Sequence, residues 1–290
     1  MGRVIVTGAG GWVGRAVVAQ LGSAGHVVEG LARERGDLSA AGTFSRLVGD
    51  GRDTAVVHLA ASLDRSENAE GQERQWRDTF AAGRNVLGEA AAAGVGHIVA
   101  AGSMEELGSA SGALSPTEPA RPVSTYGLCK ALVREVAEFE TRRATIRVDW
   151  FRPTIVYGPG QRGQMLIPTL CQAALRGEEV DVSDGSQQRD FLYVDDLVAW
   201  ICLALRTTAP GFAIHHVGTG TPVRVSEVMD RIQAAFPNAR FRRGARPRRA
   251  HEPEVQAAGP DGTSVAGWAP AVTVAQGIER TVAWWQTQHA

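Results

Sequence analysis

The chain has 290 residues, of which 44% are hydrophobic and 21% charged, so it can bury a core of domain size, and wholesale disorder is excluded. The formal net charge of −1 argues against a broad surface for nucleic acid. Of the 30 lysines and arginines, 29 are arginine, and the single lysine is Lys130. It follows Tyr126, one of only three tyrosines, by four residues.

The sequence shows no targeting or anchoring signal. It contains no run of 18 apolar residues, which a membrane-spanning helix would need, and the N-terminus enters a strand pattern without a signal-peptide pattern. The three cysteines, Cys129, Cys171 and Cys202, lack the spacing of metal ligands. We therefore expect a cytoplasmic protein with free thiols, no metal site and no membrane partner.

The first 158 residues alternate short apolar runs with longer amphipathic stretches. The apolar runs predict strands at Val4–Thr7, Val27–Leu31, Ala55–Ala60, His97–Ala101 and Arg147–Arg152. The amphipathic stretches predict helices at Trp12–Gly22, Gln75–Ala93 and Ser124–Arg142. This alternation predicts an α/β fold, a doubly wound parallel sheet with helices on both faces.

After Pro153 the alternation breaks at a cluster of turn residues, Tyr157–Gly160. Beyond it the pattern predicts a strand at Val180–Val182, a strand and helix within Phe191–Leu205, and helices at Ile167–Arg176, Ser226–Phe236 and Val274–Gln286. A smaller C-terminal α/β region, interleaved with the first one, is therefore expected.

A glycine-rich turn follows the first predicted strand. Gly8, Gly11 and Gly14 form a Gly-x-x-Gly-x-x-Gly pattern, with Trp12 and Val13 at the start of the next helix. Glycines allow a tight turn and close approach of the backbone to a pyrophosphate, and the helix N-terminus offers free N–H groups. This arrangement predicts dinucleotide binding, with a plain glycine turn as the alternative.

The end of the second strand bears on the choice of dinucleotide. An acidic residue there would bind the ribose 2′-hydroxyl of NAD, but this chain has Ala32, followed by Arg33 and Arg35. A guanidinium suits a 2′-phosphate, so NADP(H) is favoured over NAD(H), unless Arg33 is a solvated surface residue. Asp37 and Leu38 are expected at the adenine edge.

The Tyr126–Lys130 pair lies in a predicted helix, where residues four apart share a face. A nearby cation would lower the pKa of the phenol toward the working range, so that Tyr126 could protonate a carbonyl oxygen. Lys130 could also hold the nicotinamide ribose. Ser103, at the end of a predicted strand, could hydrogen-bond the same carbonyl oxygen. The alternatives are coincidental spacing for the pair, and a turn cap for Ser103.

The chain resembles the extended short-chain dehydrogenase/reductase family, which includes nucleotide-sugar epimerases, dehydratases and ketoreductases. The motifs that carry the resemblance are Thr7–Gly14, His58–Ala61, Gly102-Ser103, Tyr126–Lys130, Arg152-Pro153, Val156–Gly160, Arg189–Asp196 and Gly267–Pro270. The resemblance implies a Rossmann-type fold, cofactor contacts at Leu59, Ala60, Ala61 and Pro153, and a homodimer formed by the helices near 75–93 and 124–142.

The resemblance also implies a division of the chain. Residues 1–158 would bind the dinucleotide, with 189–217 returning to that domain, and residues 159–188 and 218–290 would bind a nucleotide sugar. Glu105 and Arg189 match substrate-binding positions, Arg189 being the family's diphosphate arginine. Three family positions differ: Thr79 and Ile155 replace asparagines, and Leu107 replaces a tyrosine.

The string Gly102–Gly108 resembles that of the 4-ketoreductases. The dehydratases of this family are similar to one another in a Thr-Asp-Glu motif, whose aspartate donates a proton to the leaving hydroxyl. Met104 occupies the matching position here, and its thioether cannot donate that proton, so dehydration is disfavoured. We therefore expect an NADPH-dependent reductase of a nucleotide-linked 4-keto-6-deoxyhexose, with dTDP as the favoured nucleotide. The alternatives are an NAD-dependent nucleotide-sugar 4-epimerase, a reductase of a non-sugar carbonyl, and a dinucleotide-sensing regulator without catalysis.

Residues 240–249 hold six arginines. They could form a solvated loop or a nucleic-acid patch, although the rest of the chain is not basic. The functional interpretation is that Arg246 reaches the substrate diphosphate as a bidentate donor.

Overall fold

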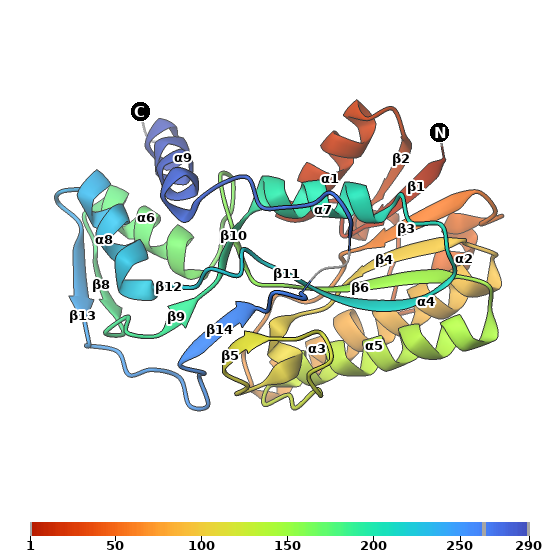
Figure 1. The fold of residues 1–290 in the computed structure, drawn as a ribbon, viewed down its shortest axis with the longest axis horizontal. Helices are drawn as coiled ribbons and strands as arrows, with labels where there is room; N and C mark the ends of the chain where they lie inside the picture. The colour runs from red at the N-terminus through yellow and green to blue at the C-terminus, as the bar shows by residue number, and fades with distance from the viewer. Residues whose placement is uncertain (1, 263–264, 289–290) are drawn as a thin grey trace.

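The computed structural model describes residues 2–262 and 265–288, so the predicted domain limits at 1 and 290 lie outside it. In these ranges the central element is a parallel sheet of six strands (Figure 1). The strands are β1 (Arg3–Thr7), β2 (Val27–Leu31), β3 (Thr54–His58), β4 (His97–Ala101), β6 (Arg147–Pro153) and β11 (Gly211–Val217). Their order across the sheet is β11-β6-β4-β3-β1-β2.

Helices cover both faces of this sheet. On one face lie α1 (Trp12–Ser23) and α7 (Val194–Ala204), and on the other lie α2 (Thr43–Val48), α4 (Ala82–Ala92) and α5 (Thr125–Arg143). The strands supply alternate side chains to the two cores, as β1 does with Val6 on the α1 side and Ile5 on the α5 side. The doubly wound, Rossmann-type fold is confirmed.

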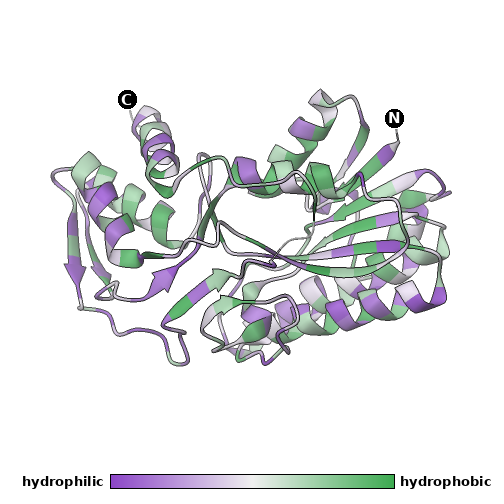
Figure 2. Ribbon diagram, in the orientation of Figure 1, coloured by the Kyte–Doolittle hydropathy of each residue, from purple (hydrophilic) through white to green (hydrophobic). Residues whose placement is uncertain are grey.

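Hydropathy follows this arrangement. Figure 2 shows mainly hydrophobic residues along the central strands, whereas hydrophilic residues recur along α5. The chain passes from β1 to β2 on one side and then crosses to β3 on the other side of β1. In doubly wound folds ligands bind at the carboxyl ends of the strands at such a switch point, here after Thr7 and His58.

The helix predicted at 75–93 is interrupted. The structure has α3 (Ala69–Gln75), a π-helical turn (Trp76–Ala81) and then α4. Inside this segment the buried Thr79 Oγ1 donates to Gln75 Oε1 at 2.7 Å and accepts from Ser62 N at 3.1 Å. A periodicity argument cannot detect such a turn, because the hydrophobic pattern changes by only one residue.

The rest of the chain forms a smaller α/β region on the left of Figure 1. Its helices are α6 (Leu166–Arg176), α8 (Val225–Ala235) and α9 (Val274–Thr287), which share one hydrophobic core with two short paired strands, β7 (Ile155–Tyr157) and β10 (Phe191–Tyr193). The division of the chain at residues 158, 189 and 217 stays a prediction.

Two small sheets in this region were not predicted as sheets, although the strand expected at Val180–Val182 is confirmed as part of β8 (Glu179–Val182). One joins β12 (Val223–Arg224), β9 (Gln188–Arg189), β14 (Val255–Ala258) and β5 (Gly112–Leu114). The other pairs β8 with β13 (Arg240–Arg243), so the expectation that 240–249 is entirely loop is wrong for its first four residues. Here the pairing places Arg242 opposite Asp181, which offsets the poor strand pattern of four residues with three arginines.

Candidate active site

The turn after β1 brings the predicted glycines together. Gly8 has a φ of +72°, in the left-handed region that favours glycine. A Cβ on Gly14 would lie 2.2 Å from the Gly8 carbonyl oxygen, so the approach of α1 to the turn also requires glycine. Gly11 is the N-cap of α1, and no side chain in the described chain caps this helix. Its first N–H groups, including those of Trp12 and Val13, are therefore suited to an anion such as pyrophosphate.

The segment after β3 lies beside this turn. Leu59 N donates to Thr7 O at 3.2 Å, and Ala60 N lies 2.9 Å from the position that a Cβ on Gly8 would occupy. Pro153 ends β6 at the same edge of the sheet. The structure thus places Leu59, Ala60 and their neighbour Ala61 next to the glycine turn, at the switch point of the sheet.

The Trp12 side chain links this turn to the second region. Its Nε1 donates to Pro159 O at 2.8 Å. The indole is therefore engaged with the 158–160 turn, which leaves the backbone N–H of Trp12 as the group available to a cofactor.

At the end of β2, Arg33 is paired with an acid that the sequence analysis did not identify. Its Nη2 lies 2.7 Å from Asp78 Oδ2, and the two side chains are 81% and 14% exposed. Asp78 also accepts from Arg77, and this hydrogen bond is the main cause of its lowered pKa. The π-helical turn carries Asp78 into this position, 45 residues from Arg33, so no local sequence signal could have revealed the pair.

Leu38, one of the two predicted adenine-edge residues, lies against α4. Asp37 accepts hydrogen bonds from the Ser39 hydroxyl and backbone N–H, and these bonds lower its pKa. The Leu38 carbonyl accepts from Asn85 Nδ2 at 3.1 Å. The charges of Asp78 and Arg77 both affect the pKa of Asp37, so the groups predicted for the adenosine end gather in one place.

The three predicted catalytic residues also come together. Tyr126 and Lys130 are buried on one face of α5, with Lys130 Nζ 5.9 Å from the centre of the Tyr126 ring. Lys130 Nζ donates to Ala101 O at 2.7 Å, which ties α5 to the end of β4. Ser103 follows β4, and its hydroxyl is close enough to the Tyr126 phenol to lower the pKa of that phenol. Its hydroxyl also accepts from Glu105 N at 3.1 Å, so it caps the next turn as the alternative interpretation proposed.

The electrostatics of this group differ from the expectation. Burial raises the pKa of Tyr126, the charge of Arg65 opposes it most strongly, and the Ser103 hydroxyl lowers the pKa to a smaller extent. Burial lowers the pKa of Lys130 to about 8. The expectation that the pKa of Tyr126 is lowered toward the working range is therefore wrong, because burial outweighs the nearby cations, and the largest lowering charge is that of Arg65.

Arg65 was not predicted as a site residue. Its guanidinium carbon lies 3.3 Å from the centre of the Tyr126 ring. Arg65 lies seven residues after His58, the last residue of β3, in a segment without hydrophobic periodicity. Its position alone therefore did not indicate a role in the site. The loop from 62 to 68 brings it to α5 through contacts between distant residues.

Two glutamates after Ser103 have different surroundings. Glu105, predicted to bind substrate, is partly exposed and accepts from Arg65 Nε at 3.2 Å and Ser124 Oγ at 2.9 Å. Glu106 is fully buried and accepts from Ser103 N, from Trp150 Nε1 and from Arg152 Nε, the last at 2.9 Å. Glu106 therefore fixes the turn that carries Ser103.

The intervening Met104 and Leu107 are buried in a small cluster with Leu114. Met104, at the position of the dehydratase aspartate, is thus a core residue. Leu107, at the position where the resemblance implies a tyrosine, fills the same cluster.

The predicted diphosphate arginines are in different states. Arg189 is buried and pairs with Glu252 at 2.8 Å, and burial lowers its pKa. Arg246 is exposed, and its backbone N–H donates to Val182 O at 3.2 Å. Both residues lie in the smaller region.

Three other arginines of 240–249 pair with carboxylates: Arg242 with Asp181, Arg243 with Asp230 and Arg248 with Glu254. These pairs cancel much of the local positive charge, so the segment is a weak candidate for binding nucleic acid.

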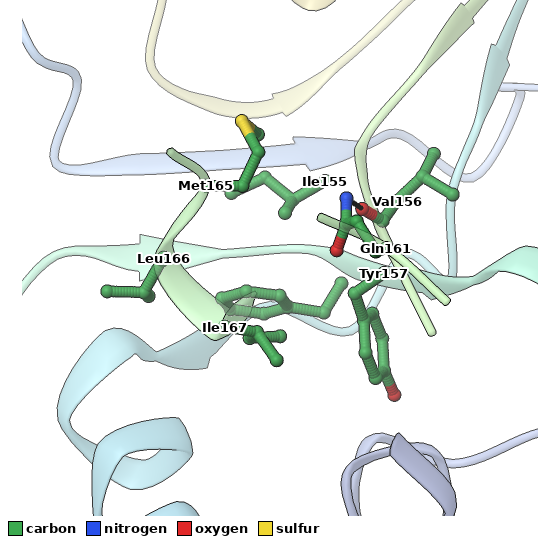
Figure 3. A pocket seen from close by; sticks show the side chains of 8 residues that line it. Ile155, Val156, Tyr157, Gln161, Met165, Leu166 and Ile167 are labelled. Carbon is green, nitrogen blue, oxygen red and sulfur yellow. Dashed lines mark hydrogen bonds between the residues drawn. The ribbon is translucent and has the colours of Figure 1, made fainter. Parts of the chain in front are cut away.

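A small cavity of about 60 Å³ lies in the second region (Figure 3). Its lining is apolar, with Ile155, Tyr157 and Met165 among the eight residues, and Gln161 donates to Val156 O at 3.0 Å beside it. None of the predicted site residues is among the described residues that line it. The cavity is therefore separate from the Tyr126 group.

Possible metal ligands, thiols and membrane spans complete the description of the chain. In residues 2–262 and 265–288, no three His, Cys, Asp or Glu side chains gather as metal ligands would. Burial raises the pKa of Cys129 to about 11 and of Cys171 to about 12, so both thiols are held in the unreactive form. None of the helices in these ranges is long and apolar enough to cross a membrane.

Residues 4–218 match the profile of the NAD dependent epimerase/dehydratase family. The chain therefore belongs to this family, and it carries the glycine turn, the Tyr126–Lys130 pair and the doubly wound sheet described above.

Particular relatives have different activities. The chain is 30% identical over 260 residues to the dTDP-glucose 4,6-dehydratase of Streptomyces griseus, covering 87% of this chain and 76% of that one. It is 27% identical to the 2-alkyl-3-oxoalkanoate reductase of Stenotrophomonas maltophilia, over 80% of this chain and 75% of that one. The solved structure of MoeE5 in complex with UDP-glucose and NAD is 28% identical, with a TM-score of 0.89, and each chain is covered completely.

Proposed function

We propose that this protein is an NADPH-dependent reductase of a nucleotide-linked 4-keto-6-deoxyhexose. The observation that carries the proposal is the convergence of Tyr126, Lys130 and Ser103 at the carboxyl edge of the sheet that also holds the glycine turn. This arrangement supports proton transfer to a carbonyl oxygen beside a bound nicotinamide.

The three residues have different parts in the reaction. A nicotinamide cofactor, when bound, would supply the hydride for carbon 4 of the sugar. Tyr126 donates its phenolic proton to the carbonyl oxygen, and Ser103 hydrogen-bonds that oxygen and stabilises the charge that develops there. Lys130, held by the Ala101 carbonyl, binds the nicotinamide ribose and returns positive charge to the site when it is protonated.

The choice of NADPH rests on Arg33. Ala32 leaves no carboxylate at the end of β2 for a ribose 2′-hydroxyl, and the Arg33 guanidinium is exposed enough to turn toward a 2′-phosphate. Gly8, Gly11 and Gly14 would hold the pyrophosphate against α1, with Asp37 and Leu38 near the adenine and Leu59, Ala60, Ala61 and Pro153 along the cofactor.

The nucleotide-sugar substrate, favoured as a dTDP derivative, would be held by Arg189 and Arg246 at the diphosphate and by Glu105 at the sugar. The similarity to a dTDP-glucose 4,6-dehydratase supports this class of substrate. The burial of Met104 argues against dehydration, since a buried thioether has no proton to donate to a leaving hydroxyl.

One observation favours a second candidate, an NAD-dependent nucleotide-sugar 4-epimerase. Asp78 neutralises Arg33, and a carboxylate at this point could accept a hydrogen bond from a 2′-hydroxyl. MoeE5, which is similar over its whole length, was solved with NAD and UDP-glucose. In an epimerase the same Tyr126 would alternate between base and acid.

Two assays of the purified protein test these candidates. In the first, NADPH or NADH is mixed with dTDP-4-keto-6-deoxyglucose, and absorbance at 340 nm is followed. In the second, UDP-glucose is added with NAD, and the formation of UDP-galactose is measured. Loss of absorbance with NADPH supports the reductase, whereas interconversion of the two sugars supports the epimerase and overturns the first proposal.

We also propose a homodimer in the cytoplasm. Trp76, Leu128 and Phe139 are exposed apolar side chains on the π-helical turn and α5, the helices that the family resemblance places at the dimer contact. Sedimentation at micromolar concentration, compared with Phe139→Glu, tests the dimer, and a monomeric wild-type protein would overturn it.

A further inference from the structure

The loop from 62 to 68 is fixed onto the first turn of α5. The Glu67 carboxylate accepts from Thr125 N at 3.0 Å and from Thr125 Oγ1 at 2.6 Å, at the positive end of the helix. At the other side of the loop, Asp64 pairs with Arg74 and Ser62 N donates to Thr79 Oγ1. The backbone that carries Arg65 is therefore held from three directions.

Arg65 itself is held by hydrogen bonds as well as by the ring. Its Nε lies 3.2 Å from Glu105 Oε1, and its Nη1 donates to Ser62 O at 3.1 Å. Its side chain is 33% exposed, although it lies in a surface loop. Glu105 also accepts from Ser124 Oγ, the N-cap of α5, so the carboxylate joins the arginine to the helix that bears Tyr126.

The two cations near Tyr126 are arranged differently. Lys130 Nζ is 5.9 Å from the ring centre and gives a hydrogen bond to Ala101 O, whereas the Arg65 guanidinium carbon is 3.3 Å from that centre. An ammonium in a buried site can lose its proton near neutral pH, but a guanidinium keeps its charge there. Arg65 is thus the cation whose charge at the phenol does not depend on the working pH.

We propose that Arg65 is a positioning residue for proton transfer by Tyr126: it holds the phenol ring and places a permanent positive charge beside it, while Glu105 limits how strongly that charge acts. The inference rests on the proposed function, because it assumes that Tyr126 is the group that transfers the proton.

The electrostatics of the site support this arrangement. Among the effects that lower the pKa of Tyr126 the charge of Arg65 is the largest, and among those that raise it Glu105 follows burial. Removing the charge of Arg65 should therefore raise the pKa of the phenol, and removing the charge of Glu105 should lower it. A purely structural role of the loop predicts no such opposite shifts.

The test titrates the phenol directly. Tyrosinate absorbance at 295 nm is followed in the full chain from pH 8 to the highest pH at which circular dichroism shows a folded protein, and the curve of Tyr126→Phe is subtracted to isolate Tyr126. We expect Arg65→Gln to move the midpoint up by about one pH unit, since Glu105 already offsets part of the charge, and Glu105→Gln to move it down. Arg65→Lys should restore most of the wild-type midpoint.

Arg142→Gln is the matched control, because Arg142 is an exposed arginine at the far end of the same helix. Circular dichroism at each pH identifies any variant that unfolds, and such a variant is replaced by Arg65→Met. Midpoints of Arg65→Gln and Glu105→Gln that coincide with wild type would overturn the proposal, as would shifts of equal sign.

A second measurement separates this inference from the proposed function. The pH profile of kcat/KM for reduction of the 4-keto sugar should move in parallel with the phenol midpoint. The titration needs no substrate, so shifted midpoints in a protein that reduces no 4-keto sugar would overturn the reductase and retain the role of Arg65. Unshifted midpoints in an active reductase would do the reverse.

Discussion

Replacing Arg33 by alanine tests how the protein selects its dinucleotide. Opening the exposed Arg33–Asp78 ion pair costs at most about 1 kcal/mol. A charge-assisted hydrogen bond from the guanidinium to a 2′-phosphate contributes about 1.5–3 kcal/mol. The net gain of about 1–2 kcal/mol predicts that Arg33→Ala weakens NADPH binding about five- to thirtyfold and leaves NADH binding unchanged.

The assay titrates each cofactor into the protein at fixed salt and follows nucleotide fluorescence. Arg35→Ala is the matched control, because Arg35 lies two residues away and pairs with Glu29 at 2.8 Å instead. Asp78→Asn should tighten NADPH binding, since it frees Arg33 and removes a negative charge from the phosphate site. Equal losses for both cofactors in Arg33→Ala, or no loss for NADPH, would refute the reasoning.

Three further predictions follow from buried groups. Lys130→Arg should lower kcat at least about a hundredfold, because a planar guanidinium does not fit in the place of the ammonium beside Ala101 O. The assay follows NADPH absorbance at 340 nm, and wild-type turnover would contradict the prediction. Glu106→Gln should reduce the free energy of unfolding in urea by about 3–5 kcal/mol, because Arg152 loses its buried partner; an unchanged midpoint would count against it. Burial lowers the pKa of His216 to about 4, so the imidazole of the unfolded chain takes up a proton at a higher pH than that of the folded chain. The free energy of unfolding should therefore fall by about 3 kcal/mol as the pH drops from 6.5 to 4. In urea melts, His216→Gln should make this dependence on pH flatter.

The sequence predicted the central fold because its signals are local. Uniformly apolar runs such as Val4–Thr7, separated by helical periodicity, identify buried parallel strands, and five of these runs are β1, β2, β3, β4 and β6 in the structure. The glycine turn was recognisable for the same reason, since its conformation and its close contact with α1 depend on residues within seven positions.

The parts that were missed depend on contacts between distant residues. Arg65 reaches Tyr126 across 61 positions of the sequence, and no pattern around Arg65 marks it. Asp78 is likewise an ordinary acid in a helical segment until the fold brings it to Arg33. The direction of the Tyr126 pKa was also beyond the sequence, because it depends on the depth of burial and on the competition between Arg65 and Glu105.

The π-helical turn at Trp76–Ala81 connects two ends of the site that are otherwise separate. Asp78 on this turn meets Arg33 at the proposed adenosine end, and its neighbour Thr79 holds Ser62 at the start of the loop that carries Arg65. One irregular turn thus sets the rotational phase of both contacts. A deletion of one residue there would turn the preceding helix by about 100° relative to α4. Cofactor selection and the acidity of the tyrosine would then be altered together by a single change in chain length.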